Sequence, residues 1–194
     1  GFTLRNGTFP TNWGGAAIFL GAAPTVVNCV FEASSAAHGG GVANYESGTA
    51  VFIGCVFRNN TATSFGGGVA NFDASPVFRD CVFEDNEAVD AAIFTEGGGA
   101  AHRLATVRYE NCRFEGNSAE DGGGMHVRNE SDVELIDCVF IDNLATTATG
   151  GGVRSTLDSS VHAAGSRFLG NRASQWGGGI MSSFSTDLRL VNCE

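Results

Sequence analysis

A recurring pattern of cysteine, phenylalanine, asparagine and glycine constrains this chain more than any other feature of its sequence. Cysteine returns at steps of 26, 26, 31, 26, 28 and 27 residues, obtained by subtraction with Ser166 counted in the series. Phenylalanine follows the first six of these positions by two residues, and a glycine block comes later in each repeat. Such a period with several short apolar runs predicts a β-solenoid, because no single run could bury its apolar face alone.

Three short strands are expected in each repeat. Glycine blocks such as Gly66 to Gly68 predict corners, where a bare backbone turns sharply. One strand follows each corner, and another precedes each cysteine with the alternation of Val133 and Leu135. We therefore predict one all-β domain over residues 1–194 with three short parallel sheets and seven coils, starting near residues 1, 29, 55, 81, 112, 138 and 166. No capping helix is evident.

Equivalent inward residues of successive coils should lie about 4.8 Å apart and form ladders of like side chains. The predicted ladder residues are Cys29, Cys55, Cys81, Cys112, Cys138, Cys193, Phe31, Phe57, Phe83, Phe114, Phe140, Phe168, Asn60, Asn86, Asn117, Asn143 and Asn171. A buried asparagine amide can donate to the next coil and satisfy turn backbone groups. Cysteines in one register point the same way, so we expect a ladder of free thiols that act as small apolar fillers.

Charge and hydropathy exclude several classes of partner. Acidic residues outnumber basic ones by 21 to 11, and the net charge is −10. Nucleic acids and anionic membranes are bound by clustered positive charge, so neither is expected as a partner. No apolar run approaches the roughly 18 residues of a membrane-spanning helix, so we expect no membrane insertion.

The segments CVFRNNTATSFGGGVAN and CRFEGNSAEDGGGMHV resemble the repeats of polymorphic outer membrane proteins. Many right-handed parallel β-helix proteins of the pectin-lyase-like superfamily share these repeats. The resemblance covers nearly the whole chain and implies a right-handed parallel β-helix that is extracellular or on the cell surface. It also implies an adhesive or structural role, although related helices with added catalytic residues are polysaccharide lyases or hydrolases.

No convincing catalytic cluster is visible in the sequence. A lyase on this scaffold should combine acidic calcium ligands with a Lys, Arg or His base on one outward strand surface. Lysine is absent, and the nearest histidines, His102 and His126, differ by one strand position, which can point them opposite ways. Carboxylates such as Asp80 and Asp137 sit at turns, where they can cap backbone amides. We therefore predict no cofactor, with a calcium ion between stacked turns as the alternative.

Several residues are candidates for contact with a partner. Aromatic residues ahead of the glycine blocks could stack on sugar rings or on another chain, or could simply cover the corner glycines. Valines after the cysteines should form a flat apolar outer stripe, with a second outward row at Ala43, Ala70 and Ala101. The extra residues Glu87 to Glu96 predict a loop, either functional or a tolerated insertion. The candidate contact residues are Trp13, Phe65, Trp176, Val30, Val56, Val82 and Phe94.

These observations favour an extracellular structural or adhesive module without a catalytic site of its own. Neither end shows a polar cap, so we expect either a longer β-helix from which this chain is excised or head-to-tail stacking of chains into filaments. The expected partners are other protein chains, the chain itself, or glycans. The alternative is a carbohydrate-active enzyme or glycan-binding module on the flank of the helix, which a cluster of acidic and basic side chains on one outward strand face would favour.

Overall fold

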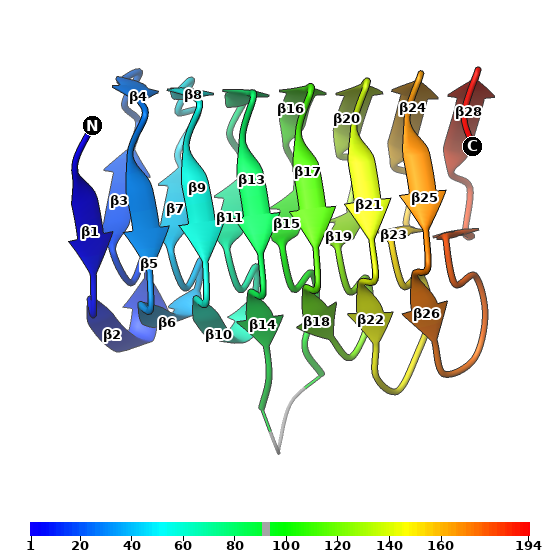
Figure 1. The fold of residues 1–194 in the computed structure, drawn as a ribbon, viewed down its shortest axis with the longest axis horizontal. Coiled ribbons are helices and arrows are strands. Elements are labelled where there is room, and N and C mark those ends of the chain that lie inside the picture. Colours follow the sequence, from blue (N-terminus) through cyan, green and yellow to red (C-terminus); the bar gives the residue numbers. More distant parts are fainter. Residues whose placement is uncertain (91–93) are drawn as a thin grey trace.

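The chain forms a parallel β-helix of seven coils. The computed structural model describes residues 1–90 and 94–194, and its strands assemble into four parallel sheets of seven strands each. The coils follow one another along the long axis of the molecule (Figure 1). Each coil contributes one strand to each sheet, and we name the sheets A to D in the order in which a coil visits them.

The strands of each sheet pair in register with the equivalent strand of the next coil. Sheet A consists of β1 (Thr3–Arg5), β5 (Val30–Glu32), β9 (Val56–Arg58), β13 (Val82–Glu84), β17 (Arg113–Glu115), β21 (Val139–Ile141) and β25 (Arg167–Leu169). Sheet B consists of β2 (Thr8–Trp13), β6 (Ser35–His38), β10 (Thr61–Phe65), β14 (Glu87–Ala88), β18 (Ser118–Ala119), β22 (Leu144–Ala145) and β26 (Arg172–Ala173). Sheet C consists of β3 (Ala17–Leu20), β7 (Val42–Tyr45), β11 (Val69–Phe72), β15 (Ala100–Arg103), β19 (Met125–Arg128), β23 (Val153–Ser155) and β27 (Ile180–Ser182). Sheet D consists of β4 (Thr25–Val27), β8 (Val51–Ile53), β12 (Val77–Arg79), β16 (Thr106–Glu110), β20 (Asp132–Ile136), β24 (Ser160–Ala164) and β28 (Asp187–Val191).

The prediction of three sheets is wrong, because the chain forms a fourth, sheet B, between the asparagine and the glycine block of each coil. From the fourth coil onward its strands are only two residues long, as in β14 and β18. Two residues with one buried alanine show no period-two alternation, which is the signal that revealed the other strands. The expected parallel solenoid with in-register coils is confirmed.

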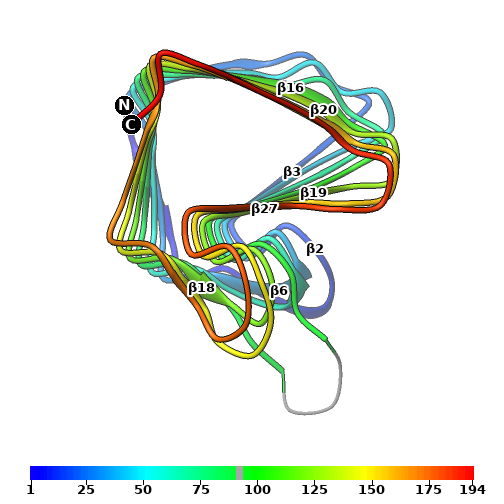
Figure 2. The ribbon, with the colours of Figure 1, turned by 90° about the vertical axis from the view of Figure 1, so that its right-hand side faces the viewer.

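Two columns of aromatic rings fill the main core, which sheets A, C and D enclose (Figure 2). In sheet A the rings of Phe83 and Phe114 stack with centroids 4.4 Å apart, and in sheet D those of Phe78 and Tyr109 stack at 4.8 Å. The columns meet edge to face, as Phe78 does against Phe83 at 5.6 Å. Offset stacks and edge-to-face contacts are the preferred aromatic geometries, so like residues at one phase stabilise each coil boundary.

Sheet B lies beside the outer face of sheet C, and a second, narrower interior separates them (Figure 2). We call this interior the B–C seam. Ala43, Ala70 and Ala101, which were expected to line an outward row, are buried. The prediction failed because the chain folds back through sheet B and covers this face of sheet C.

The asparagine ladder lies at the corner between sheets A and B. Asn86 Nδ2 donates to Phe57 O at 2.8 Å and to Asn117 Oδ1 at 3.0 Å, and the Asn86 backbone amide donates to the same Oδ1 at 3.0 Å. Asn60, Asn117 and Asn143 repeat this arrangement. Every polar atom of these buried amides thus has a partner, as burial of a polar group requires.

Polar residues with left-handed backbone form the exposed corners on either side of sheet A. Asp80, Asp85, Asp137 and Asp142 have φ angles of 53°, 50°, 51° and 50°. Aspartate and asparagine tolerate this conformation better than other side chains apart from glycine. These aspartates therefore supply the left-handed backbone conformation that the corners of the coil require.

The described residues on either side of the insertion in the fourth coil, 87–90 and 94–96, lie at the corner between sheets B and C (Figure 1). Two hydrogen bonds hold Thr95 in place. Thr95 Oγ1 donates to Ala88 O at 2.8 Å, and Thr95 N donates to Glu120 Oε2 at 2.9 Å. Residues 91–93 of the predicted loop lie outside the described residues. Phe94 is exposed beside them, so its side chain is accessible for contact.

Candidate functional site

The outer face of sheet D brings together charged side chains from successive coils. Strand alternation turns Val107 and Tyr109 of β16 into the core and leaves Thr106, Arg108 and Glu110 on the outside. The same alternation in β20, β24 and β28 places every second residue on this face. Because all these strands pair in register, outward residues of equal phase stand in straight rows.

One row crosses five coils and changes from apolar to charged. Val77, Arg108, Glu134, His162 and Arg189 are direct Cα partners from each strand to the next. Neighbouring strands of a sheet lie about 4.8 Å apart. We call this set the charged row, since it presents cationic, anionic and imidazole groups at regular intervals.

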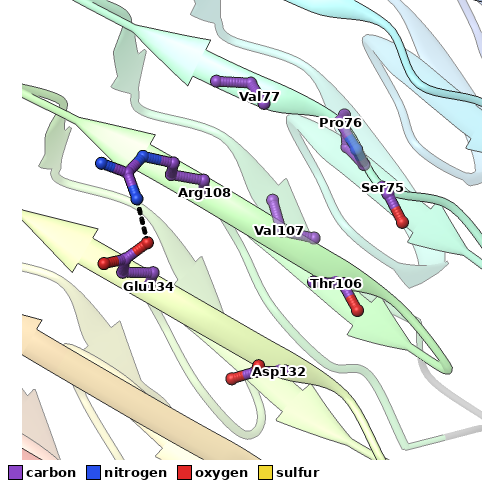
Figure 3. A pocket seen from close by; sticks show the side chains of 8 residues that line it. All are labelled: Ser75, Pro76, Val77, Thr106, Val107, Arg108, Asp132 and Glu134. Atoms are coloured by element: carbon purple, nitrogen blue, oxygen red, sulfur yellow. Dashed lines mark hydrogen bonds and ion pairs between the residues drawn. The ribbon is translucent and has the colours of Figure 1, made fainter.

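Salt bridges hold the first part of the charged row in place. Arg108 pairs with Glu134, as Figure 3 shows, and Arg108 Nε lies 2.5 Å from Glu110 Oε1. Arg79 Nε lies 2.7 Å from Glu110 Oε2 on the same face. These side chains are partly exposed to water, so each pair adds little to stability. Their main effect is to fix the directions of the charged groups.

The contact between Arg108 and Glu110 keeps both side chains ionised. The hydrogen bond from Arg108 is the largest of the effects that lower the pKa of Glu110, and the hydrogen bond to Glu110 raises the pKa of Arg108. Opposite charge within hydrogen-bonding distance favours the charged form of both partners. Glu110 and Arg108 therefore both stay charged through the physiological pH range.

Two shallow hollows adjoin the charged row. The first has a volume of about 290 Å³ and is lined by Pro76, Val77 and Thr106 together with Arg108, Asp132 and Glu134 (Figure 3). The second has a volume of about 320 Å³ and is lined in part by Glu134, His162 and Arg189. Glu134 lines both hollows, so the two hollows adjoin at this residue.

Further polar groups border the hollows. His162 Nε2 lies 3.2 Å from Asp187 Oδ2, and Ser160 Oγ lies 2.5 Å from Asp132 Oδ1. Carboxylate, imidazole, guanidinium and hydroxyl groups together can hydrogen-bond a ligand rich in hydroxyl groups. A carboxylate and a histidine on neighbouring strands are also the groups that acid–base catalysis uses most often.

The structure separates the predicted aromatic contact residues. The Trp13 ring packs inside the B–C seam against those of His38, Tyr45 and Phe72, with centroids 4.4, 4.9 and 4.5 Å apart. Phe65 continues the seam by stacking on His38 at 5.2 Å. Trp176, by contrast, is 64% exposed.

The other predicted contact residues lie on a different side of the molecule from sheet D. Val30, Val56 and Val82 are direct Cα partners on the outer face of sheet A, where they are half-buried. The structure thus brings the three valines into one row, but it does not bring them near Phe94 or the charged row.

The middle of the B–C seam is ionic. Glu96 pairs with Arg128, and its Oε2 lies 3.2 Å from His126 Nδ1. In the next coil Asp121 Oδ2 lies 3.4 Å from Arg154 Nε. Burial alone would raise the pKa of Glu96, but the contacts with His126 and Arg128 outweigh burial and lower it. Charges of opposite sign thus compensate one another in this buried place.

His102 and His126 face opposite sides of sheet C. His102 points into the main core, where its Nδ1 lies 3.0 Å from Asn71 Nδ2 and its Nε2 lies 3.2 Å from Tyr109 Oη. Since Asn71 Nδ2 can only donate, His102 Nδ1 accepts and Nε2 carries the proton. Burial lowers the pKa of His102 to about 3, so this residue is neutral and structural.

The six cysteines are all free, and five of them are buried. Each buried thiol faces backbone carbonyls, as Cys81 Sγ does with Arg79 O at 3.2 Å. Burial raises the pKa of the Cys112 thiol. Among residues 1–90 and 94–194 there is no group of three or more histidine, cysteine, aspartate or glutamate side chains that could hold a metal ion.

Sequence reasoning missed the charged row. Its members differ from coil to coil, so they left no repeat in the sequence. The signal was present in the period-two alternation of residues 106–110, 132–136, 160–164 and 187–191. Aligning these four segments on their inward residues would have placed Arg108, Glu134, His162 and Arg189 in one line.

Comparison with known proteins identifies the architecture. A family model described as a right-handed β-helix region matches residues 20–194. No curated protein and no solved structure matches the chain. The described part of the chain holds no helix capable of spanning a membrane.

Proposed function

The chain belongs to the right-handed β-helix family, and from this premise we propose that it is an extracellular structural or adhesive module whose binding surface is the outer face of sheet D. One observation carries the proposal. The charged row places Arg108, Glu134, His162 and Arg189 in direct register beside two hollows that share Glu134.

The chemistry of this face favours a glycan as the partner. Guanidinium and carboxylate groups in fixed directions donate and accept hydrogen bonds, which suits a chain of hydroxyl groups. The row extends over several coils, so a linear polymer lying along the axis could contact every coil in turn. Positive and negative groups alternate on this face, so we do not expect it to attract an anionic ligand by charge alone.

Affinity electrophoresis of the purified chain in gels that contain polygalacturonate, alginate or dextran tests this proposal. We expect at least one polysaccharide to retard the wild-type chain and the double variant Arg108→Ala, Glu134→Ala to migrate as in the empty gel. The matched control is Arg58→Ala, Glu32→Ala, which removes a salt bridge of 2.7 Å from the outer face of sheet A. Equal loss of retardation in both variants would exclude sheet D as the specific surface.

A carbohydrate-active enzyme is the second candidate, because acidic and basic side chains do gather on this one outward strand face. Glu134, His162 and Arg189 supply a carboxylate, an imidazole and a guanidinium on adjoining strands. New reducing ends, or ultraviolet absorbance of an unsaturated product, would reveal hydrolysis or elimination of the retained polysaccharide. Activity that Glu134→Gln abolishes without loss of retardation would establish the enzyme.

Head-to-tail stacking of chains stays a prediction. Sedimentation velocity over a range of concentrations, with electron microscopy of the same samples, distinguishes filaments from dispersed single chains.

A further inference from the structure

Three triplets in the sequence have the form Asn-x-Ser/Thr, the acceptor motif for N-linked glycans. They are NGT at residues 6–8, NNT at 59–61 and NES at 129–131. The chain contains many other asparagines, including all of the buried ladder, and none of those has serine or threonine two residues later. In the structure the first two triplets differ from the third in the accessibility of their side chains.

The asparagines of the first two triplets share one corner of the coil. Asn6 and Asn59 both lie at the exposed turn between sheets A and B, with φ angles of 58° and 52°. The backbone amide of Asn59 donates to Glu84 O at 3.1 Å, which fixes the turn. In the described part of the chain neither side-chain amide has a hydrogen-bond partner. Both amides therefore project into solvent from a rigid backbone.

Asn60 shows the contrast within a single triplet. It follows Asn59 directly, but it is buried and its Nδ2 donates to Phe31 O at 2.9 Å and to Asn86 Oδ1 at 3.0 Å. Thr61 and Thr8, the hydroxyl residues of the two triplets, are half-buried and exposed, and in the described part of the chain their hydroxyls have no partner. The groups that the acceptor motif requires are thus accessible in both triplets.

The third triplet is closed by its own hydrogen bonds. Ser131 is 1% exposed, its hydroxyl donates to Arg128 O at 2.7 Å, and it accepts from Ala105 N at 3.2 Å. Asn129 Oδ1 accepts from Arg128 Nε at 3.0 Å. An enzyme that must engage this hydroxyl would have to break the turn.

We propose that Asn6 and Asn59 accept N-linked glycans on the folded chain and that Asn129 does not. This proposal rests on the extracellular location proposed above. The co-reactant is a lipid-diphosphate-linked oligosaccharide with its transferase. Asn Nδ2 forms a bond to the anomeric carbon, the bond from that carbon to the diphosphate oxygen breaks, Nδ2 loses one proton and the lipid diphosphate leaves.

The position of the two acceptors is compatible with the proposed binding surface. The full width of sheet A separates their corner from sheet D (Figure 2). Glycans at Asn6 and Asn59, which stand two coils apart on one edge, would cover that edge and leave the charged row free.

The test incubates the folded chain with a purified oligosaccharyltransferase and lipid-linked oligosaccharide, then maps the products by peptide mass spectrometry. We expect glycans at Asn6 and Asn59 and none at Asn129. A synthetic peptide of residues 125–135 should be modified at Asn129, because it lacks the closed turn. Thr61→Ala should lose the glycan at Asn59, whereas Thr61→Ser should retain it.

Two results would overturn the proposal: unmodified Asn6 and Asn59 on a folded chain when the peptide is modified, or equal modification of Asn129 on the folded chain. The reaction uses purified components, so its outcome does not depend on where the protein is located or on polysaccharide retardation by sheet D. Failure of the sheet D variants would thus leave this result unchanged, and the reverse also holds.

Discussion

Asn60 directs two hydrogen bonds at a single oxygen of Asn86, one from its backbone amide at 3.1 Å and one from its side-chain Nδ2 at 3.0 Å. Asn86 in turn donates to the carbonyl of Phe57 in the preceding coil. One side chain therefore satisfies buried polar groups of two coils, and the same relationship recurs down the corner between sheets A and B.

Asn86→Ala should destabilise the chain by about 3 kcal/mol, because each buried donor or acceptor left without a partner costs about 1–3 kcal/mol. The expected cost for Asn171→Ala is smaller, since Asn171 is only half-buried and water can replace its bonds. Urea denaturation followed by circular dichroism measures both. Equal costs would show that the ladder does not act through buried hydrogen bonds.

Acid should destabilise the fold through His102. Its pKa is about 3 in the folded chain against 6.5 ordinarily, so below about pH 6.5 only the unfolded chain binds the proton. Stability therefore falls as pH falls, by up to about 1.4 kcal/mol per pH unit until the folded pKa is reached. His102→Asn, which copies Asn71 in the preceding coil, should flatten this dependence between about pH 6.5 and about pH 5.

The control for this experiment is His162→Asn, because His162 lies on the outer face of sheet D. Denaturation of the three proteins at several pH values gives the slopes. A slope that His102→Asn leaves unchanged, or that His162→Asn removes, would contradict the assignment to His102.

Gly152→Ala and Gly179→Ala compare one glycine-block position in adjacent coils. A Cβ on Gly152 would lie 2.5 Å from the backbone oxygen of Gly179, whereas a Cβ on Gly179 would meet nothing nearer than Phe168 Cβ at 3.6 Å. Overpacking against backbone should cost Gly152→Ala about 3 kcal/mol, and Gly179→Ala should change stability by less than about 1 kcal/mol. Thermal unfolding measures the stabilities of the two variants. If the coils meet as described, Gly152→Ala must be the less stable one.

The five buried thiols of the ladder should not react with thiol reagents in the folded chain. Five cysteines are buried, and Cys193 is partly exposed, so an aromatic disulfide reagent should react quickly with Cys193 alone. Cys193→Ser should abolish the fast phase, and denaturant should expose the other five. Fewer than six reactive thiols in denaturant without reductant would instead indicate disulfides.

The repeats predicted the core but not the outer surface. Phe83 and Asn86 recur at one phase because every coil must fill the same space and satisfy the same turn, so sequence alone reveals them. Sheet B was missed because from the fourth coil onward its strands have only two residues, and a strand that short shows no period-two alternation.

The candidate site was hidden for the opposite reason. Arg108 and Glu134 differ in type and belong to different coils, and only the register of β16 on β20 places them side by side. The pairing of Glu96 with His126 likewise depends on the return of the chain through sheet B, which no local pattern indicated.

The direction of the backbone hydrogen bonds has a mechanical consequence. Each links one coil to the next, as Val56 N does with Cys29 O and Val82 N with Cys55 O, so the bonds run along the axis of the rod. A force that pulls the two ends apart would load the bonds of one coil boundary at a time and peel coils off in sequence. A force across the axis would be shared among all coils, which makes the rod weak in tension at its ends and stiff against sideways load.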